Sequence, residues 1–138
     1  DYMADTGERE QISAENRKAA DRILQLCREN GAQLLLVELP TVTSWNAARH
    51  RGVAEFAAAR ELEFLDLNLL YDQMGLDGAV AFRDAGNHLN VTGATAVTAY
   101  LGRYIARQYR LSDLRGNSRY ANRQEEWVCY RRFVNGNV

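Results

Sequence analysis

An aspartate and a histidine stand close together in the stretch FRDAGNHLNVTGA, which runs from Phe82 to Ala94. A histidine acts as a general base when an acceptor orients one ring nitrogen and the other nitrogen meets a proton donor. Asp84 lies four positions before His88 in a glycine-containing loop, so its carboxylate can be that acceptor. The pair therefore predicts acid–base chemistry, which needs a nucleophile from elsewhere in the fold.

Two other interpretations of this stretch stay open. Asp, Gly and Asn before a helix are also the residues that turns and helix caps require. A metal site would draw oxygen and nitrogen ligands from Asp77, Asp84, Asn87 and His88, but the regular alternation of a calcium loop is missing. We predict no metal and no cofactor. The second histidine, His50, stands beside arginines in an alanine-rich segment and is predicted to be a solvated surface residue.

The segments around this pair alternate between helix and strand. Ser13 is a suitable N-cap and Gly31 a suitable stop for the first helix, and Thr92 is the predicted cap of the last one. The predicted elements are a helix over 13–30, a buried apolar strand over 33–40, a helix over 46–62, a short strand over 63–70, a loop over 71–90 and a helix over 91–109.

This order predicts an α/β fold with a parallel sheet, in which ligands gather at the carboxyl ends of the strands. The loop TVTSWN leaves the carboxyl end of the first strand, and the loop 71–90 follows the second strand, so that a site at the carboxyl edge of the sheet is within its reach. Two parallel strands make a thin core. We therefore expect a further strand hidden near either end of the chain, or a sheet that is part of a larger one.

The composition is typical of one globular domain: of the 138 residues, 46% are hydrophobic, and the formal net charge is −1. This balance gives no large field to attract nucleic acid, and no apolar run is long enough to cross a bilayer. We expect neither nucleic acid nor membrane contact by this chain. Cys27 and Cys129 match no metal or redox spacing, and Cys27 is predicted to be a buried structural thiol.

The tail from 110 to 138 differs in composition from the rest of the chain. Trp127, Tyr130 and Phe133 are three positions apart, which places them along one side of a helix. We predict a main domain over 1–109 and a C-terminal tail over 110–138 that packs on it.

The run FRDAGNHLNVTGATAVTAYLGRYI resembles the last conserved block of the SGNH (GDSL-like) hydrolases, in which an Asp and a His complete a triad with an N-terminal serine. A bacterial branch of that family also shows segments similar to LLLVELP, FLDLN and the tail. The resemblance implies a flavodoxin-like three-layer α/β/α fold, of which this chain holds the C-terminal part. It also implies an esterase or O-acyltransferase of the cell envelope or exterior, with catalytic Asp84 and His88.

The chain departs from the family pattern in two respects. Asp84 and His88 are four positions apart instead of the usual three. The Gly-Asp-Ser block and the segments that build the oxyanion hole are absent, and neither Ser13, Ser112 nor Ser118 has the context of a nucleophile. Ser44 lies in the right layer of the sheet but lacks a strand–turn–helix elbow.

Two hypotheses follow from these residues. In the first, the chain is the C-terminal portion of an SGNH-like enzyme that acts on acylated small molecules or carbohydrate. It is then inactive alone, and it dimerises or associates with a missing N-terminal half, a portion of the protein upstream of Asp1. In the second, it is a noncatalytic α/β interaction module whose Asp-His turn is structural.

Overall fold

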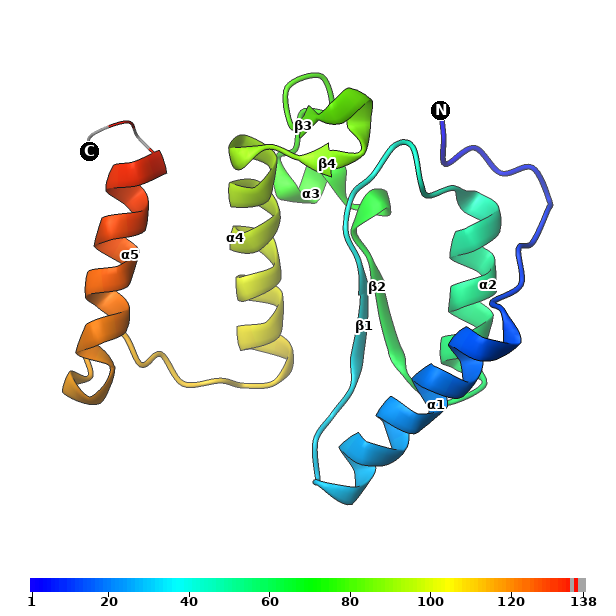
Figure 1. Cartoon of the computed structure of the whole chain (residues 1–138), viewed down its shortest axis with the longest axis horizontal. Helices are drawn as coiled ribbons and strands as arrows, with labels where there is room; N and C mark the ends of the chain where they lie inside the picture. The colour runs from blue at the N-terminus through cyan, green and yellow to red at the C-terminus, as the bar shows by residue number, and fades with distance from the viewer. Residues whose placement is uncertain (135, 137–138) are drawn as a thin grey trace. The chain divides into compact units, whose positions relative to one another are not determined.

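The computed structural model describes residues 1–134 and 136 (Figure 1). The chain falls into two compact units, one from Asp1 to Val97 and one from Thr98 onward, and each is described by itself. Their division lies inside helix α4 (Val91–Gln108), whereas the sequence places a boundary after residue 109.

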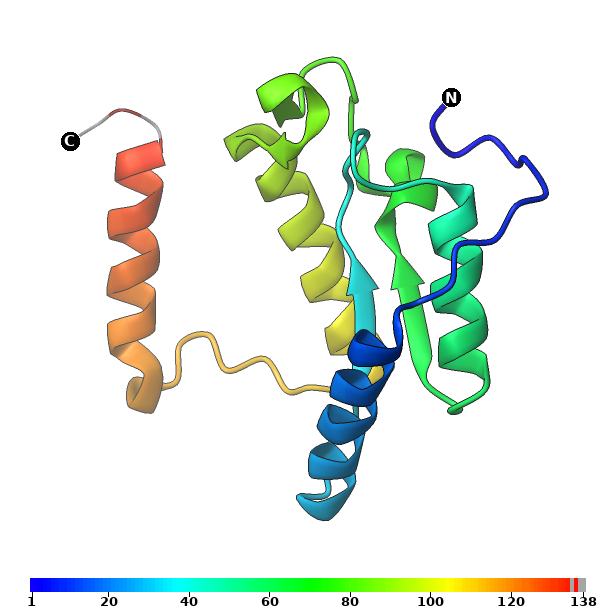
Figure 2. The same ribbon diagram turned by 45° about the vertical axis from the view of Figure 1, so that its right-hand side comes forward.

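The first unit is built on two parallel strands, β1 (Leu35–Glu38) and β2 (Glu63–Asp66). All four residues of each strand pair in register, so the two strands end at the same level. Helix α2 (Ala47–Ala58) connects them and packs along β2 (Figures 1 and 2). The predicted helix–strand alternation and the parallel pairing are confirmed.

The sheet is small. Within residues 1–134 and 136, no third strand joins β1 and β2. Each residue of β1 is only half-buried, so the prediction of a strand buried on both faces is wrong. The reason is that β1 has a strand neighbour along one edge only. Helices and small sheets of an α/β chain are present, and a three-layer sheet is not formed by these residues alone.

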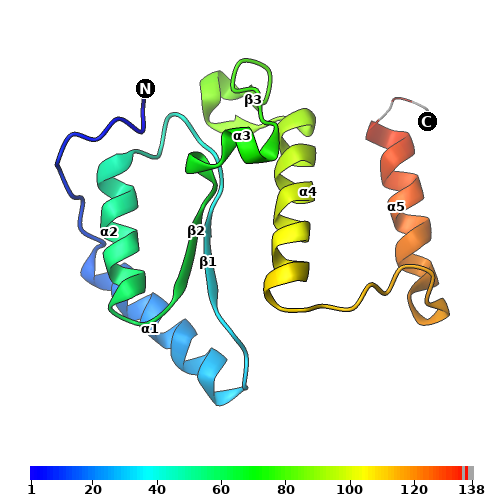
Figure 3. The ribbon, with the colours of Figure 1, turned by 180° about the vertical axis from the view of Figure 1, so that it is seen from behind.

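Helix α1 (Ala14–Glu29) has the ends that its sequence predicts. The Ser13 hydroxyl accepts a backbone N–H of the first turn at 3.1 Å, and Gly31 follows the helix in the left-handed conformation with φ of 63°. The Asp21 carboxylate pairs with Arg60 at 2.5 Å, just before β2 begins. This ion pair holds α1 at the amino ends of the strands (Figure 3).

The segment after β2 is more structured than the predicted loop. It lies beyond the carboxyl ends of both strands (Figures 2 and 3). Its elements are the 3₁₀ turn η1 (Leu67–Leu69), the short helix α3 (Tyr71–Met74), strand β3 (Phe82–Arg83), the 3₁₀ turn η2 (Asp84–Gly86) and strand β4 (His88–Leu89), which is antiparallel to β3.

Helix α4 is capped by Asn90 and not by the predicted Thr92. The Asn90 Oδ1 accepts the N–H of Gly93 at 3.1 Å, and its Nδ2 donates to the carbonyl of Val80 at 2.7 Å. A threonine at position 92 already lies inside the first turn, where its hydroxyl cannot replace that acceptor. Asn90 thus starts the helix and ties it to the preceding loop.

Replacing Asn90 with alanine should lower the free energy of unfolding by about 1–2 kcal/mol, because a helix cap and the bond to Val80 are lost together. Urea denaturation followed by circular dichroism measures this change. The matched variant Thr92→Ala should leave the urea midpoint nearly unaltered. A larger loss from Thr92→Ala than from Asn90→Ala would contradict the assignment of the cap.

The second unit contains the rest of α4, the turn η3 (Ser118–Tyr120) and helix α5 (Ala121–Val134). The rings of Trp127 and Tyr130 stack with their centroids 5.8 Å apart. Together with Phe133 these side chains are 52%, 50% and 72% exposed. The predicted helical spacing is confirmed, and packing of the tail on the main domain stays a prediction.

Candidate functional site

The hairpin of β3 and β4 brings the predicted acid and base together. Arg83 stands opposite His88 in the ladder, and η2 fills the turn between them. The Nδ1 atom of His88 lies 2.9 Å from Oδ2 of Asp84. With the proton on Nδ1, this hydrogen bond leaves the lone pair of Nε2 as the basic position of a neutral ring. The structure thus brings the two side chains into the arrangement that a histidine base and its orienting carboxylate require.

The turn holds two residues in a costly backbone conformation. Asp84 and Ala85 have φ values of 53° and 54°, in the left-handed region that residues with a Cβ rarely adopt. Gly86 follows with φ of 96°. Three successive left-handed residues let the carboxylate of Asp84 fold back onto a histidine that is four positions away, one more than the family spacing. Strain of this kind gathers at functional sites.

The turn is fixed against the loop that follows β1. The N–H of Val42 donates to the carbonyl of Gly86 at 3.0 Å, and the hydroxyl of Thr43 donates to Oδ1 of Asn87 at 3.1 Å. A Cβ on Gly86 would lie 2.0 Å from Cγ2 of Val42, so only glycine permits this approach. The loops after the two strands therefore meet at the carboxyl edge of the sheet.

Ser44 lies beside this turn without contacting the base. Its Oγ is 3.0 Å from Oγ1 of Thr41 and 3.4 Å from Oδ1 of Asn87. Asn87 in turn approaches Nδ1 of His88, the nitrogen that Asp84 already occupies. Among the described residues, Ser44 has no hydrogen bond to His88. The serine therefore lies near the pair but has the partners Thr41 and Asn87 in place of the histidine.

The pair is open to solvent. The side chains of Asp84 and His88 are 57% and 58% exposed, and Arg83 lies 3.8 Å from the same carboxylate oxygen. An ion pair this exposed adds little to stability, because water screens it. Its geometry is set by the backbone of the turn and not by burial of the charges.

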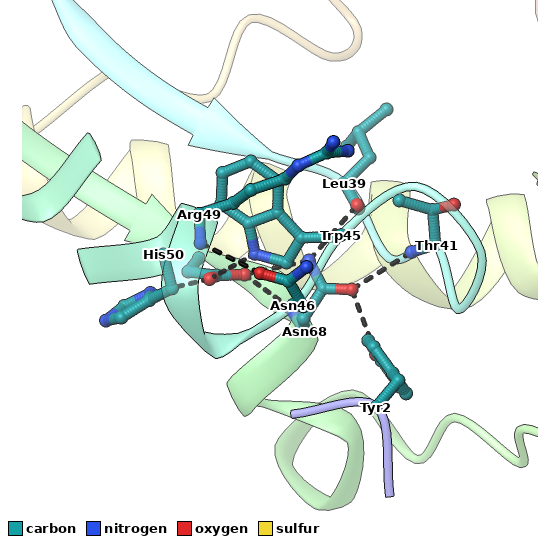
Figure 4. Close-up of polar contacts among 9 residues, drawn as sticks. Tyr2, Leu39, Thr41, Trp45, Asn46, Arg49, His50 and Asn68 are labelled. Atoms are coloured by element: carbon teal, nitrogen blue, oxygen red, sulfur yellow. Dashed lines mark hydrogen bonds and ion pairs between the residues drawn. The ribbon is translucent and has the colours of Figure 1, made fainter. Parts of the chain in front are cut away.

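A second Asp–His pair lies at the end of β2, where the sequence predicts none (Figure 4). The Nδ1 atom of His50 is 2.7 Å from Oδ2 of Asp66, and the Trp45 indole N–H donates to that oxygen at 2.8 Å. The His50 side chain is 28% exposed and that of Asp66 is 1% exposed. His50 is therefore a partly buried member of a network, and the prediction of a solvated surface residue is wrong.

Asn68 extends this network between the two strand ends. Its backbone N–H and its Nδ2 both donate to Oδ1 of Asp66, at 2.9 and 2.8 Å. Its Oδ1 accepts the N–H of Thr41 at 3.0 Å and the hydroxyl of Tyr2 at 2.9 Å. Burial and the hydrogen bond to Tyr71 raise the pKa of Tyr2, so its phenol stays a donor. The loops after β1 and β2 are thereby locked together.

Sequence reasoning missed this cluster because its members are spread over three segments of the chain. The sequence contains one signal of the cluster. Asp66 and Asn68 stand at the end of the second strand, and the polar residues of the loop up to Trp45 follow the first strand. Because β1 and β2 are parallel, the side chains that follow them converge. His50 reaches the same point from the first turns of α2.

Metal binding gains no support from the residues that are described, since no three His, Cys, Asp or Glu side chains gather there as a metal ion would need. The Asp77 carboxylate accepts the N–H of Ala79 at 2.9 Å in a separate turn.

Among the helices of residues 1–134 and 136, none combines the length and the apolar character that crossing a bilayer requires.

Comparison with protein-family models, with characterised proteins and with solved structures finds no match to this chain. The site is therefore interpreted from its own geometry and from the sequence resemblance.

The left-handed turn yields a stability prediction. Ala85→Gly should raise the free energy of unfolding by about 1 kcal/mol, because glycine adopts this conformation without steric cost. Ala19→Gly, in the middle of α1, is the matched control and should lower it by about 1 kcal/mol. Urea denaturation measures both changes. Destabilisation by both substitutions would show that Ala85 is not left-handed in solution.

Glu38 predicts a pH dependence. Burial, followed by the nearby charge of Asp66, raises the pKa of Glu38 in the folded chain. The folded state therefore keeps this proton to a higher pH than the unfolded chain, and the free energy of unfolding falls as the pH rises through the pKa of Glu38. Glu38→Gln should raise the melting temperature near neutral pH.

The same substitution should have little effect below the ordinary pKa of 4.5, where both states are protonated. Thermal unfolding at the two pH values measures the difference. The exposed residue Glu61, changed to Gln, is the control and should show no such pH-dependent gain. An equal gain from Glu38→Gln at both pH values would contradict the electrostatic explanation.

Proposed function

We propose that this chain is the C-terminal portion of an SGNH-like serine esterase or O-acyltransferase, in which Asp84 and His88 are the acid–base pair. The observation that carries the proposal is the 2.9 Å hydrogen bond from His88 Nδ1 to Asp84, held by a strained turn at the carboxyl ends of two parallel strands. That edge is where α/β enzymes assemble their sites.

In the proposed reaction, Nε2 of His88 takes the proton from a serine hydroxyl as its oxygen attacks the carbonyl carbon of an ester. Asp84 keeps the ring in the required tautomer and stabilises the imidazolium ion. The same proton then passes to the leaving alcohol as the tetrahedral intermediate collapses to an acyl-serine. Water or an acceptor alcohol removes the acyl group by the reverse steps.

The proposal assigns the serine and the oxyanion donors to a part of the protein that precedes Asp1. Ser44 donates to Asn87 and not to His88, and triad members act as a unit, so the chain alone should not turn over. The two-stranded sheet supports this incompleteness, since β1 has an edge that a further strand can occupy. Completed in this way, β1 and β2 would belong to a flavodoxin-like three-layer α/β/α sheet.

The proposed substrate class follows from the sequence resemblance alone. We propose an ester or acetyl group on a small molecule or a carbohydrate, met outside the cell or in its envelope. No cofactor enters the proposed mechanism, because the proton transfers need only Asp84, His88 and the serine.

A noncatalytic interaction module is the second candidate. The observation that favours it is the exposure of the pair, since 57% and 58% exposed side chains resemble a surface turn more than a water-excluded site. In that case the bond between Asp84 and His88 closes the turn, and the unpaired edge of β1 receives another chain.

The isolated chain should hydrolyse p-nitrophenyl acetate no faster than its His88→Ala variant, because it lacks the nucleophile. In a longer form of the protein that includes a Gly-Asp-Ser block upstream of Asp1, activity is expected. There His88→Ala should lower kcat by about a thousandfold or more, and Asp84→Asn should lower it with little change in KM.

His50→Gln is the matched control, because His50 also pairs with an aspartate through Nδ1. It should alter stability while kcat per folded molecule stays near that of the parent. A fluorophosphonate probe should label the upstream serine in the longer protein. Turnover by the isolated chain that His88→Ala abolishes, or a longer protein without labelling, would refute the proposal.

A further inference from the structure

The near-neutral charge of the whole chain conceals two oppositely charged units. Residues 1–97 contain nine basic and fifteen acidic residues, which gives a net charge of −6. Residues 98–138 contain eight basic and three acidic residues, which gives +5. A difference in net charge of this size between two parts of one chain indicates that the basic part, residues 98–138, has a binding role.

The basic unit has the composition of a protein-binding surface. All eight of its basic residues are arginines, and none is a lysine. Arginine and aromatic residues are enriched in protein–protein interfaces and lysine is depleted, whereas lipid headgroups and phosphate backbones also attract lysine. Glu125 and Glu126 on α5 further disfavour a polyanion.

The aromatic side chains share helix α5 with three of these arginines, Arg123, Arg131 and Arg132, and with the two glutamates. We call the second half of this helix, residues 127–134, the basic arm; it presents Trp127, Tyr130 and Phe133 to solvent, and its charged residues are Arg131 and Arg132 in the last turn. Within residues 1–134 and 136, α5 has no buried residue. A helix whose aromatic residues and arginines are both exposed is suited to an acidic surface that also has an apolar part.

The first unit carries a surface with these properties, which we call the 69–91 surface. Its exposed apolar and acidic members are Leu69, Asp72, Asp77, Val80, Asp84 and Val91, and Arg83 and His88 are exposed in the same segment. The segment is continuous in space, because the side-chain amide of Asn90 donates to the carbonyl of Val80 and the rings of Tyr71 and Phe82 lie 6.4 Å apart. One short segment of the first unit therefore carries both exposed carboxylates and exposed apolar side chains.

We propose that the basic arm of one molecule docks on the 69–91 surface of a second copy, so that two reciprocal contacts hold a twofold dimer. The occupant is a second copy because the complementary acidic and apolar surface is present in this protein itself. Reciprocal exchange of identical contacts gives a closed dimer, the commonest form of assembly. The proposal does not rest on the esterase function.

Sedimentation velocity should find a dimer whose dissociation constant rises with salt, since opposite charges steer and hold the two surfaces. The double variant Arg131→Glu/Arg132→Glu should weaken the dimer by roughly tenfold or more. Asp72→Arg/Asp77→Arg should weaken it as well, because each homodimer then faces like charges at both contacts.

An equimolar mixture of these two variants should restore dimerisation, since every contact in the mixed dimer joins opposite charges. Lys18→Glu/Arg22→Glu, an equal change of charge on α1, is the control and should leave the dimer intact. Circular dichroism confirms that each variant is folded.

A chain that stays monomeric at all concentrations would overturn the proposal, including the case in which the arm folds onto its own molecule. So would a monomer that binds phosphatidylserine vesicles, because the arm would then be a membrane contact. Failure of the mixed variants to associate would also overturn it. None of these outcomes alters the expectations for p-nitrophenyl acetate hydrolysis.

Discussion

The carboxylate of Asp66 has to find hydrogen-bond donors in a place that water hardly reaches. An uncompensated charge at this level of burial would cost several kcal/mol, roughly the stability margin of a small domain. Four donors remove that cost: the backbone and side chain of Asn68, the indole of Trp45 and the ring of His50. Because these donors come from both strand ends and from α2, satisfying one charge fixes the relative position of three segments.

The exposed pair at Asp84 and His88 depends on that buried charge through a short series of bonds. Asn68 is held by Asp66 and accepts the N–H of Thr41, which sets the path of the loop after β1. The next residues of that loop bind the turn that carries the pair, through Gly86 and Asn87. A residue pair with little burial of its own is in this way positioned by a cluster whose central carboxylate, that of Asp66, is almost fully buried.

Patterns within a few residues of one another were predictable, and those that depend on distant segments were not. The cap at Ser13, the helical stripe of Trp127 and the meeting of Asp84 with His88 all follow from local spacing. The cap of α4 was misplaced because Asn90 is selected by its bond to Val80 as well as by the helix. The burial of His50 does not follow from its neighbours because its partner Asp66 lies in strand β2, and the burial of β1 depends on how many strands surround it.

The number of residues between two contacting side chains also sets the entropic cost of forming their contact. The bond between His88 and Asp84 closes a loop of four residues, which a chain samples within microseconds or less. The contact of Tyr2 with Asn68 spans 66 residues and carries a larger entropic cost of closure. The contact of Asp84 with His88 therefore costs little chain entropy, whereas the contacts that fix its turn, such as that of Thr43 with Asn87 across 44 residues, carry a larger closure cost.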